Sequence, residues 1–243
     1  MNITIIGSGN VGSALTASIT KAGHSVVHAG RGTQSIQTAA RGADIVIIAV
    51  PYATAGKDVA TALAPVISNA IVIDATNPIK PDMSGLGAEH GSAAEDFAAW
   101  LPGARVVKAF NTLFASVQGD PTTLGVTVDA LFATDDESAR TTVAELLASM
   151  GFRPVYVGPL ARAHELEAIA YLNISLQMQP TGTWRTAVGF IEPPQAATGT
   201  GAKAALPTCG RWQRGRPRMS ASRRCTWATA LRRSSMIPYG PSS

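Results

Sequence analysis

The chain has 243 residues, of which 46% are apolar and 15% charged, so it can bury a large core and does not have the composition of a disordered protein. No uncharged apolar run approaches the roughly 18 residues of a membrane span, and no membrane partner is expected. The apolar stretch at Met1–Ile6 is too short for a signal peptide, which predicts a cytoplasmic protein.

The net charge of +4 belongs to the end of the chain. Nine of the 20 basic residues and both cysteines follow Glu192, where no acidic residue occurs, so residues 1–192 hold 11 basic and 16 acidic side chains. We therefore predict a domain over 1–192 and a basic tail of low order over 193–243. The tail has three interpretations: an arm that binds nucleic acid or membrane, a segment that docks on a partner, or an out-of-frame extension. Its arginines lack aromatic pairing or helical phase, which makes the nucleic-acid signal weak.

The first thirty residues predict a strand, a helix and a second strand. Asn2–Ile6 is apolar, residues 10–22 have apolar positions at helical spacing, and Ser25–Ala29 is apolar again. Gly23 ends the predicted helix. These elements form a βαβ unit.

Strands and helices continue to alternate after this unit. Ser92 and Glu95 form a capping box, Asp135 is expected to cap a helix, and Pro159 precedes a long last helix over 159–179. The further predicted strands are 44–50, 70–75, 105–110, 129–134 and 153–157, and the further predicted helices are 34–41, 53–64, 92–101 and 136–150.

This alternation predicts an α/β fold, a Rossmann-type doubly wound parallel sheet with right-handed crossovers. Only fourteen residues separate Ala29 from Asp44, which is room for one short helix. We therefore expect the third, edge strand to be missing or short.

The turn after the first strand has the pattern of a dinucleotide site. Gly7 allows the tight turn, Gly9 lets backbone approach a pyrophosphate, and Gly12 lets the helix pack on the sheet. The start of the helix offers free N–H groups to phosphate. The predicted cofactor-binding residues of this turn are Gly7, Ser8, Gly9, Asn10, Val11 and Gly12.

The end of the second strand favours NADP(H) over NAD(H). An acidic residue there would bind the ribose 2′-hydroxyl of NAD, but residues 28–33 contain none. Arg31 can instead bind a 2′-phosphate through two hydrogen bonds, and Thr33 can donate another. Gly30, Arg31 and Thr33 are therefore predicted to bind the cofactor.

Two further turns end consecutive central strands, where ligands of such sheets bind. We expect both turns to face the ribose and nicotinamide, with Asn77 either bonding the ligand or capping its own turn. The predicted cofactor-binding residues of these turns are Ala49, Val50, Pro51, Tyr52, Asn77 and Pro78.

Catalytic candidates are few. Lys108 lies inside an apolar strand and is expected either to reach a ligand or to extend to solvent. Asn111, with Thr112, follows that strand and is the better candidate. His90 is expected to be exposed, and His164 and Glu165 do not share a helix face. No nucleophile–base pair or metal constellation can be assembled, which leaves hydride transfer by a cofactor.

The ordered motifs Gly7–Gly12, Ala49-Val50-Pro51, Thr76-Asn77-Pro78, Lys108-Ala109-Phe110-Asn111-Thr112 and Gly158-Pro159-Leu160 with Glu165-Leu166-Glu167 resemble those of the coenzyme F420-dependent NADP oxidoreductases. The resemblance covers residues 1–192. It implies hydride exchange between NADPH and a flavin or deazaflavin (coenzyme F420-like) acceptor, with the nicotinamide near Val50, Pro51 and Asn77. It also implies an acceptor ring near Asn111 and the last helix, and a homodimer through that helix.

Two other functions stay open. One is an NADPH-dependent reductase of a small imine, ketone or hydroxy acid, which needs a proton donor such as Lys108. The other is a non-catalytic protein that senses NADP(H). The acceptor itself is not specified by the residues.

We predict that Arg31→Ala weakens NADPH binding by about 1–3 kcal/mol, the cost of losing a charge-assisted hydrogen bond. Titration of NADPH and NADH against both proteins tests this, because the affinity for NADH should not change. An equal loss for both nucleotides would exclude a 2′-phosphate contact at Arg31.

Overall fold

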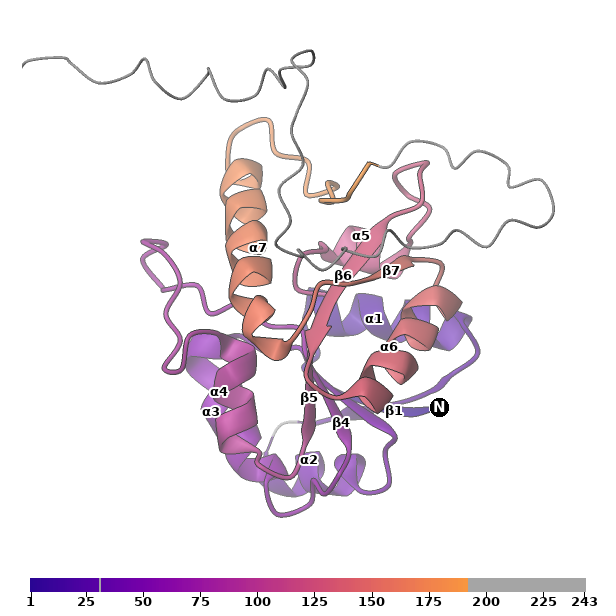
Figure 1. The fold of residues 1–243 in the computed structure, drawn as a ribbon, viewed down its shortest axis with the longest axis vertical. Helices are drawn as coiled ribbons and strands as arrows, with labels where there is room; N and C mark the ends of the chain where they lie inside the picture. The colour runs from indigo at the N-terminus through magenta and orange to yellow at the C-terminus, as the bar shows by residue number, and fades with distance from the viewer. Residues whose placement is uncertain (31, 192–243) are drawn as a thin grey trace, which may run out of the picture. The chain divides into compact units, whose positions relative to one another are not determined.

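The computed structural model describes residues 1–30 and 32–191. Arg31 and the tail 193–243, for which a cofactor contact and low order were predicted, lie outside the described residues. Those described belong to one compact unit, Met1–Glu192, in which a central sheet has helices on both faces (Figure 1).

The described residues form seven strands and seven α-helices, which follow the predicted order except for the short helix α5, which was not predicted. The strands are β1 (Asn2–Ile6), β2 (Ser25–Ala29), β3 (Ile45–Ile48), β4 (Ile71–Asp74), β5 (Arg105–Ala109), β6 (Asp129–Thr134) and β7 (Arg153–Tyr156). The helices are α1 (Asn10–Lys21), α2 (Thr33–Ala40), α3 (Tyr52–Leu63), α4 (Ala93–Trp100), α5 (Ala115–Gly119), α6 (Glu137–Ser149) and α7 (Ala163–Gln177).

The sheet order is β2-β1-β3-β4-β5-β6-β7, which confirms the Rossmann-type fold. Between β2 and β3 the described residues form only α2, and no strand pairs with the outer edge of β2, so the predicted loss of an edge strand is confirmed. Val27 of this edge is 49% exposed.

The parallel register brings the carboxyl ends of the first five strands to one level. Ile6 pairs with Ala29 on one side and with Ile48 on the other. Ile48 pairs with Asp74, and Asp74 with Lys108. The turns that follow these strands therefore share one edge of the sheet, where the ligands of such folds bind.

The prediction of a wholly parallel sheet is wrong for the last two strands. β6 runs antiparallel to β5, and β7 runs parallel to β6. A parallel connection must carry the chain back along the sheet. The five-residue α5 rises only about 7 Å, less than half of the roughly 17 Å of a five-residue strand. The chain stays at the carboxyl edge of β5 and enters β6 from there, with Ala109 opposite Phe132 and Val107 opposite Thr134.

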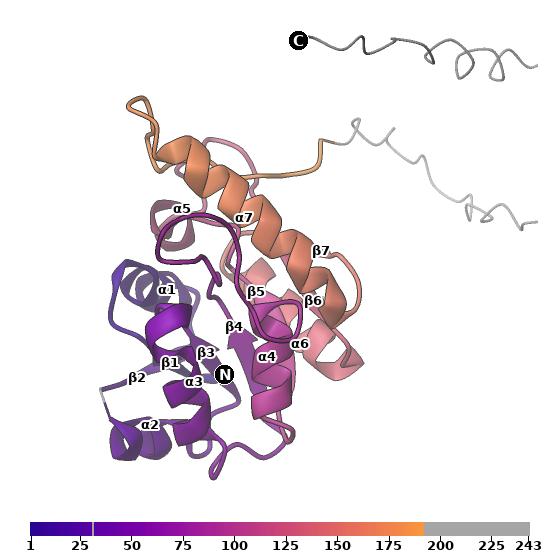
Figure 2. The same ribbon diagram turned by 90° about the vertical axis from the view of Figure 1, so that its left-hand side faces the viewer.

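Two apolar layers separate the sheet from its helices. Alternate residues of β3 face opposite ways, so Ile45 and Ile47 pack in the layer of α1, α5 and α6, and Val46 and Ile48 in that of α2, α3 and α4. In Figure 1, α7 lies on the same side of the sheet as α4. The loop from β4 to α4 extends toward α7 (Figure 2), where the Tyr171 hydroxyl donates to the Met83 carbonyl at 2.6 Å.

The N-termini of three helices test the predicted caps, and one prediction is confirmed and two are wrong. Ser92 caps α4 by accepting from the Glu95 N–H, as expected. Asp136, not Asp135, caps α6, because Asp135 instead accepts from the Leu160 N–H at 3.0 Å. The last helix starts later than Pro159, since Leu160–Arg162 forms a 3-10 turn before Ala163.

Among the helices described, none combines the length and apolar character needed to cross a bilayer.

Candidate functional site: the carboxyl edge of the sheet

The glycine turn packs as tightly as the motif requires. A Cβ on Gly7, whose φ is 123°, would lie 2.2 Å from the Ala49 carbonyl oxygen. A Cβ on Gly12 would lie 1.8 Å from the Gly7 carbonyl oxygen. Gly9 differs, because nothing lies within 4 Å of the position of its missing Cβ. Gly7 and Gly12 therefore close the turn against the sheet, and Gly9 leaves open space in front of it.

The start of α1 faces this open space. Ser8, Gly9 and Asn10 are exposed, no side chain caps the helix, and its first turn contains no acidic residue. The uncapped N–H groups and the positive end of the helix dipole suit an anion. Val11, in the first turn, lines a pocket at the sheet edge.

A second turn, at the end of β2, adjoins the glycine turn because Ala29 pairs with Ile6. A Cβ on Gly30 would lie 2.9 Å from the Ser35 hydroxyl oxygen, so α2 closes on this turn. Thr33 is the first residue of α2, and it lines an open surface hollow together with Val27, His28, Gly32, Gln34, Ser35, Thr38, Ala39 and Arg41. The predicted residues Gly30 and Thr33 therefore lie beside the glycine turn.

In the turn after β3, the backbone lies against the glycine turn, but the Tyr52 side chain points elsewhere. The Ala49 N–H donates to the Ile6 carbonyl at 2.8 Å, and Val50 and Pro51 carry the chain into α3. The Tyr52 ring instead stacks on Trp100, with the ring centroids 6.2 Å apart, and its hydroxyl donates to Asp96. A Tyr52 side-chain contact with a dinucleotide would have to break these interactions.

Asp96 is fully buried and holds the loop that precedes α4. It accepts from the backbone N–H groups of Glu89 and His90 and from the His90 ring at 2.6 Å. Burial acts to raise the pKa of Asp96, but the hydrogen bonds from Tyr52, Glu89 and His90 outweigh it and lower the pKa. His90 is half-exposed, as expected, but it is paired with a carboxylate.

Asn77 and Asn111 form a reciprocal pair across the ends of β4 and β5. The Asn77 amide donates to the Asn111 backbone carbonyl at 3.1 Å, and the Asn111 amide donates to Asn77 Oδ1 at 3.0 Å. The buried Pro78 carbonyl accepts from the Gly87 N–H at 2.7 Å, so Pro78 anchors the next loop. The structure thus brings the predicted site residues Asn77 and Asn111 together.

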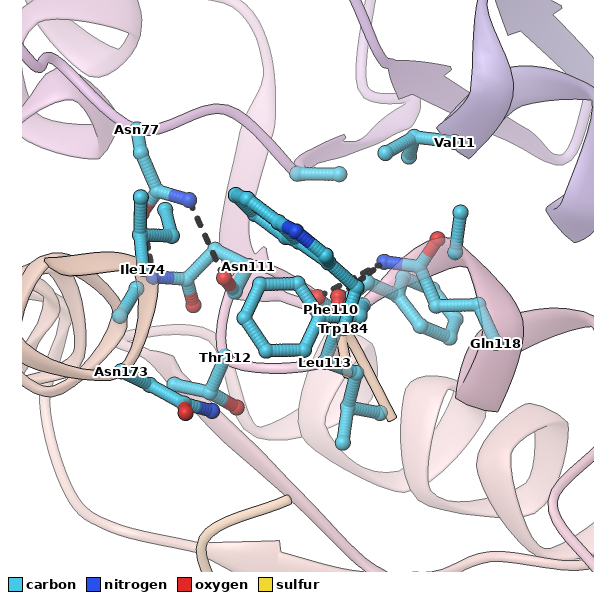
Figure 3. Close-up of a pocket in the computed structure, with 14 residues that line it drawn as sticks. Val11, Asn77, Phe110, Asn111, Thr112, Leu113, Gln118, Asn173, Ile174 and Trp184 are labelled. Carbon is cyan, nitrogen blue, oxygen red and sulfur yellow. Dashed lines mark hydrogen bonds between the residues drawn. The ribbon is translucent and has the colours of Figure 1, made fainter. Parts of the chain in front are cut away.

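The pocket at this edge has a volume of about 170 Å³ (Figure 3). In the figure the three asparagines lie on one side, with Val11 and Gln118 opposite and Trp184 between them. Phe110, at the end of β5, has a φ of 66° and is fully buried. The lining residues are Val11, Ala75, Asn77, Phe110, Asn111, Thr112, Leu113, Phe114, Ala115, Gln118, Ala170, Asn173, Ile174 and Trp184.

Four buried polar atoms of this lining have no hydrogen-bond partner among the described residues. They are Asn111 Oδ1, Thr112 Oγ1, Gln118 Oε1 and Asn173 Nδ2. Buried polar groups are nearly always paired. Their concentration around one cavity marks a place for a polar ligand or water.

Most of the residues that line the pocket were not predicted as site residues, among them Asn173, Gln118 and Trp184. The sequence does hold a signal for Asn173: its spacing from Leu166, Ala170 and Gln177 places it on the buried face of α7, where a polar side chain is unusual. Gln118 and Trp184 carry no comparable signal, because a five-residue helix and a loop bring them to the pocket.

Lys108 lies in neither of the two places expected, because it contacts neither the pocket nor solvent. Its ammonium is fully buried and donates to Asp74 Oδ2 at 2.8 Å, to the Thr76 carbonyl at 2.7 Å and to Glu167 Oε1 at 2.6 Å. These bonds use all three of its N–H groups. Lys108 therefore has no proton-donating position free for a substrate in this arrangement.

Glu167, on α7, is the third charged side chain of this cluster. Its Oε1 also accepts from the Ala93 N–H at 2.9 Å, and its Oε2 has no partner among the described residues. Burial raises the pKa of Glu167 to about 7, although Lys108 acts in the opposite direction.

Comparison with known proteins follows this geometry. The family model described as "NADP oxidoreductase coenzyme F420-dependent" matches residues 2–41. A solved structure from Arthrobacter sp. FB24, assigned as an F420-dependent NADP-reductase, is 24% identical, with a TM-score of 0.63 over 72% of this chain and 92% of its own; at that identity the likeness shows the fold.

Two relatives have higher identity. A hypothetical protein from Sinorhizobium meliloti is 32% identical, with a TM-score of 0.54 over 66% of this chain and 86% of its own. The metalloreductase STEAP3 of Rattus norvegicus is 36% identical over 108 residues, which are 44% of this chain. That match spans only 21% of the length of STEAP3.

We predict that the stability of Glu167→Gln relative to wild type increases as the pH rises from 5 to about 7, whatever its absolute level. The carboxyl has a higher pKa folded than unfolded, so its contribution to stability is present below about pH 4.3 and is lost as the pH rises through about 7. The difference in Tm between variant and wild type, measured across this range, should therefore grow with pH.

Glu165→Gln is the matched control, because Glu165 lies on the same helix with its side chain 52% exposed. Its Tm difference should show no such rise toward pH 8. A Tm difference for Glu167→Gln that is constant from pH 5 to 8 would contradict the raised pKa.

Proposed function

We propose that the chain, whose residues 2–41 match the family model of the coenzyme F420-dependent NADP oxidoreductases, transfers a hydride between NADP(H) and a flavin or deazaflavin acceptor. The observation that carries the proposal is the continuity of the glycine turn with the pocket. Val11 follows the phosphate-binding turn and lines the pocket together with Asn77 and Asn111.

The residues present fit a dinucleotide. The open side of Gly9 and the exposed Ser8 and Asn10 would hold the pyrophosphate against the start of α1. Thr33 and Gly30 would lie along the adenosine half. The sequence from His28 to Ala43 contains no acidic residue that could select the 2′-hydroxyl of NAD, which favours NADP(H).

When bound, NADPH supplies the hydride of its nicotinamide C4–H bond, and a flavin or deazaflavin takes up this hydride together with one proton from solvent. The chain's own contribution is orientation. The Asn77–Asn111 pair fixes the polar side of the pocket, and Phe114 and Trp184, with ring centroids 5.2 Å apart, provide aromatic surface for a flat ring.

Reduction of a ketone or imine is the weaker alternative for this site. Such a reaction places a proton on the substrate, and Lys108, the residue considered for that role, has all of its N–H groups engaged in the core. Asn77 and Asn111 do not titrate. An acceptor that takes its proton from solvent fits these residues better.

We expect NADPH oxidation with a riboflavin or 5-deazaflavin acceptor and none with small ketones, cyclic imines or 2-oxo acids, the oxidised forms of 2-hydroxy acids. The measurement follows NADPH absorbance anaerobically with each acceptor, using the full chain. Gly9→Val is the matched variant, because its side chain fills the space in front of α1. It should abolish turnover and NADPH binding and leave Tm nearly unchanged, since nothing lies within 4 Å of the new Cβ.

Two results would contradict the proposal. Turnover with carbonyl or imine substrates but not with flavins would favour the alternative reductase. Tight NADPH binding without turnover on any acceptor would favour a nucleotide sensor.

We further propose that two copies associate through α7. Leu172 and Leu176 are one helical turn apart and 62% and 56% exposed, and Met178 beyond the helix is 58% exposed. Exposed apolar side chains gathered on one face mark an interaction site. A second copy is the fitting occupant because the opposite face of the same helix lines the pocket, so association would stabilise the site.

Leu172→Glu with Leu176→Glu should convert a dimer to a monomer in light scattering coupled to gel filtration, because it places charges within the interface. Val126→Glu, at a position that is 65% exposed outside α7, should leave the dimer intact. A wild-type protein that is monomeric at micromolar concentration would exclude this interface.

A further inference from the structure

Three unpaired polar atoms share one side of the pocket: Asn111 Oδ1, Thr112 Oγ1 and Asn173 Nδ2. All three residues are more than nine-tenths buried. Leaving such a group without a hydrogen bond costs about 1–3 kcal/mol. These atoms need water or a ligand as partner, and a ligand that replaces water must offer matching groups.

The amide of Asn111 has one possible orientation. The Asn77 amide nitrogen donates to a backbone carbonyl, which can only accept. Asn77 Oδ1 must therefore be the acceptor for Asn111 Nδ2. This leaves Asn111 Oδ1 unpaired, as a pure acceptor.

The two neighbours of this acceptor can donate. Asn173 Oδ1 accepts from the Thr186 hydroxyl at 2.8 Å, which leaves its Nδ2 without a partner. The Thr112 hydroxyl has no partner and can donate as well as accept. This side of the pocket thus offers one acceptor and two donors.

We propose that Asn111, Thr112 and Asn173 bind the imide edge of a pyrimidinedione ring, an N–H group between two carbonyls. Asn111 Oδ1 accepts from the imide N–H, and Thr112 and Asn173 donate to the carbonyl oxygens. This inference rests on the proposed function, since flavins and 5-deazaflavins both carry this edge. It assigns to these three residues the selection of the acceptor.

The size of the pocket agrees with binding of only the imide edge of the acceptor ring. Its volume of about 170 Å³ is below the roughly 300–1,000 Å³ of sites that enclose a drug-sized ligand. It can receive the imide ring, and the rest of a three-ring acceptor would then lie outside the pocket. Gln118, whose Nε2 donates to the Phe110 and Leu113 carbonyls, presents a further fixed acceptor on the opposite side.

The test compares riboflavin with N3-methylriboflavin, in which a methyl group replaces the hydrogen of the imide N–H, so that the donor is lost and the edge is blocked. Flavin fluorescence gives Kd, and NADPH oxidation gives kcat/KM, both with the full chain. Wild-type protein should bind riboflavin about tenfold more tightly than the methylated form, the effect of one lost hydrogen bond. 5-Deazariboflavin should bind like riboflavin, and the ratio of kcat/KM between the two identifies which ring is the better acceptor.

Thr112→Val and Asn173→Leu should each weaken riboflavin binding about tenfold and leave the Kd of NADPH unchanged. Thr141→Val, which removes a hydroxyl from an exposed position of α6, is the matched control and should change neither. The comparison of the two flavins on wild-type protein needs no variant, so misfolding of a variant cannot hide the result.

The outcomes separate this inference from the proposed reaction. Turnover of both flavins with equal Kd contradicts the imide site and supports the reaction. A Kd preference for riboflavin without turnover supports the imide site and contradicts the reaction. If Asn173→Leu weakens NADPH binding as much as riboflavin binding, the pocket holds the nicotinamide carboxamide and the imide assignment is wrong.

Discussion

The Lys108 ammonium lies in the core of the fold, and its three hydrogen bonds reach β4, the turn after β4 and α7. Removing one partner of a buried ion pair typically costs about 3–5 kcal/mol, because the other charge stays buried without compensation. The same carboxylate that binds Lys108 from α7 also accepts from the first N–H of α4. One cation therefore joins the end of the sheet to both helices that flank the site.

The cluster also sets the geometry of the pocket. Thr76 is held from both sides, because its N–H donates to Asp74 and its carbonyl accepts from Lys108. Asn77 follows directly and is aimed at Asn111. On the neighbouring strand, Phe110 adopts a left-handed φ, which costs of order 1–3 kcal/mol. This turn ends β5, and the residues after it line the pocket.

Sequence patterns predicted what depends on local chemistry. The glycine turn, the missing edge strand and the Ser92 cap follow from spacing and chain length over a few residues. Spacing did not show that Asp136 and not Asp135 caps α6, because Asp135 accepts a hydrogen bond from Leu160, which lies 25 residues away. The hydrogen bonds of Lys108 could not be predicted from the sequence either, since its acceptors lie 32 to 59 residues away. Local patterns cannot indicate such contacts.

The reversal of β6, which the sequence did not indicate, explains how α7 reaches the pocket. Because β6 starts at the carboxyl edge, the connection from Phe110 to Gln118 stays there and forms half of the lining. β7 runs with β6 and ends away from that edge, so α7 runs back toward it. Glu167 reaches the level of Lys108, and Asn173, about 9 Å further along the helix, reaches the pocket. With β6 and β7 parallel to β5, α7 would begin at the carboxyl edge and lead away from it, and Asn173 could not contribute to the pocket.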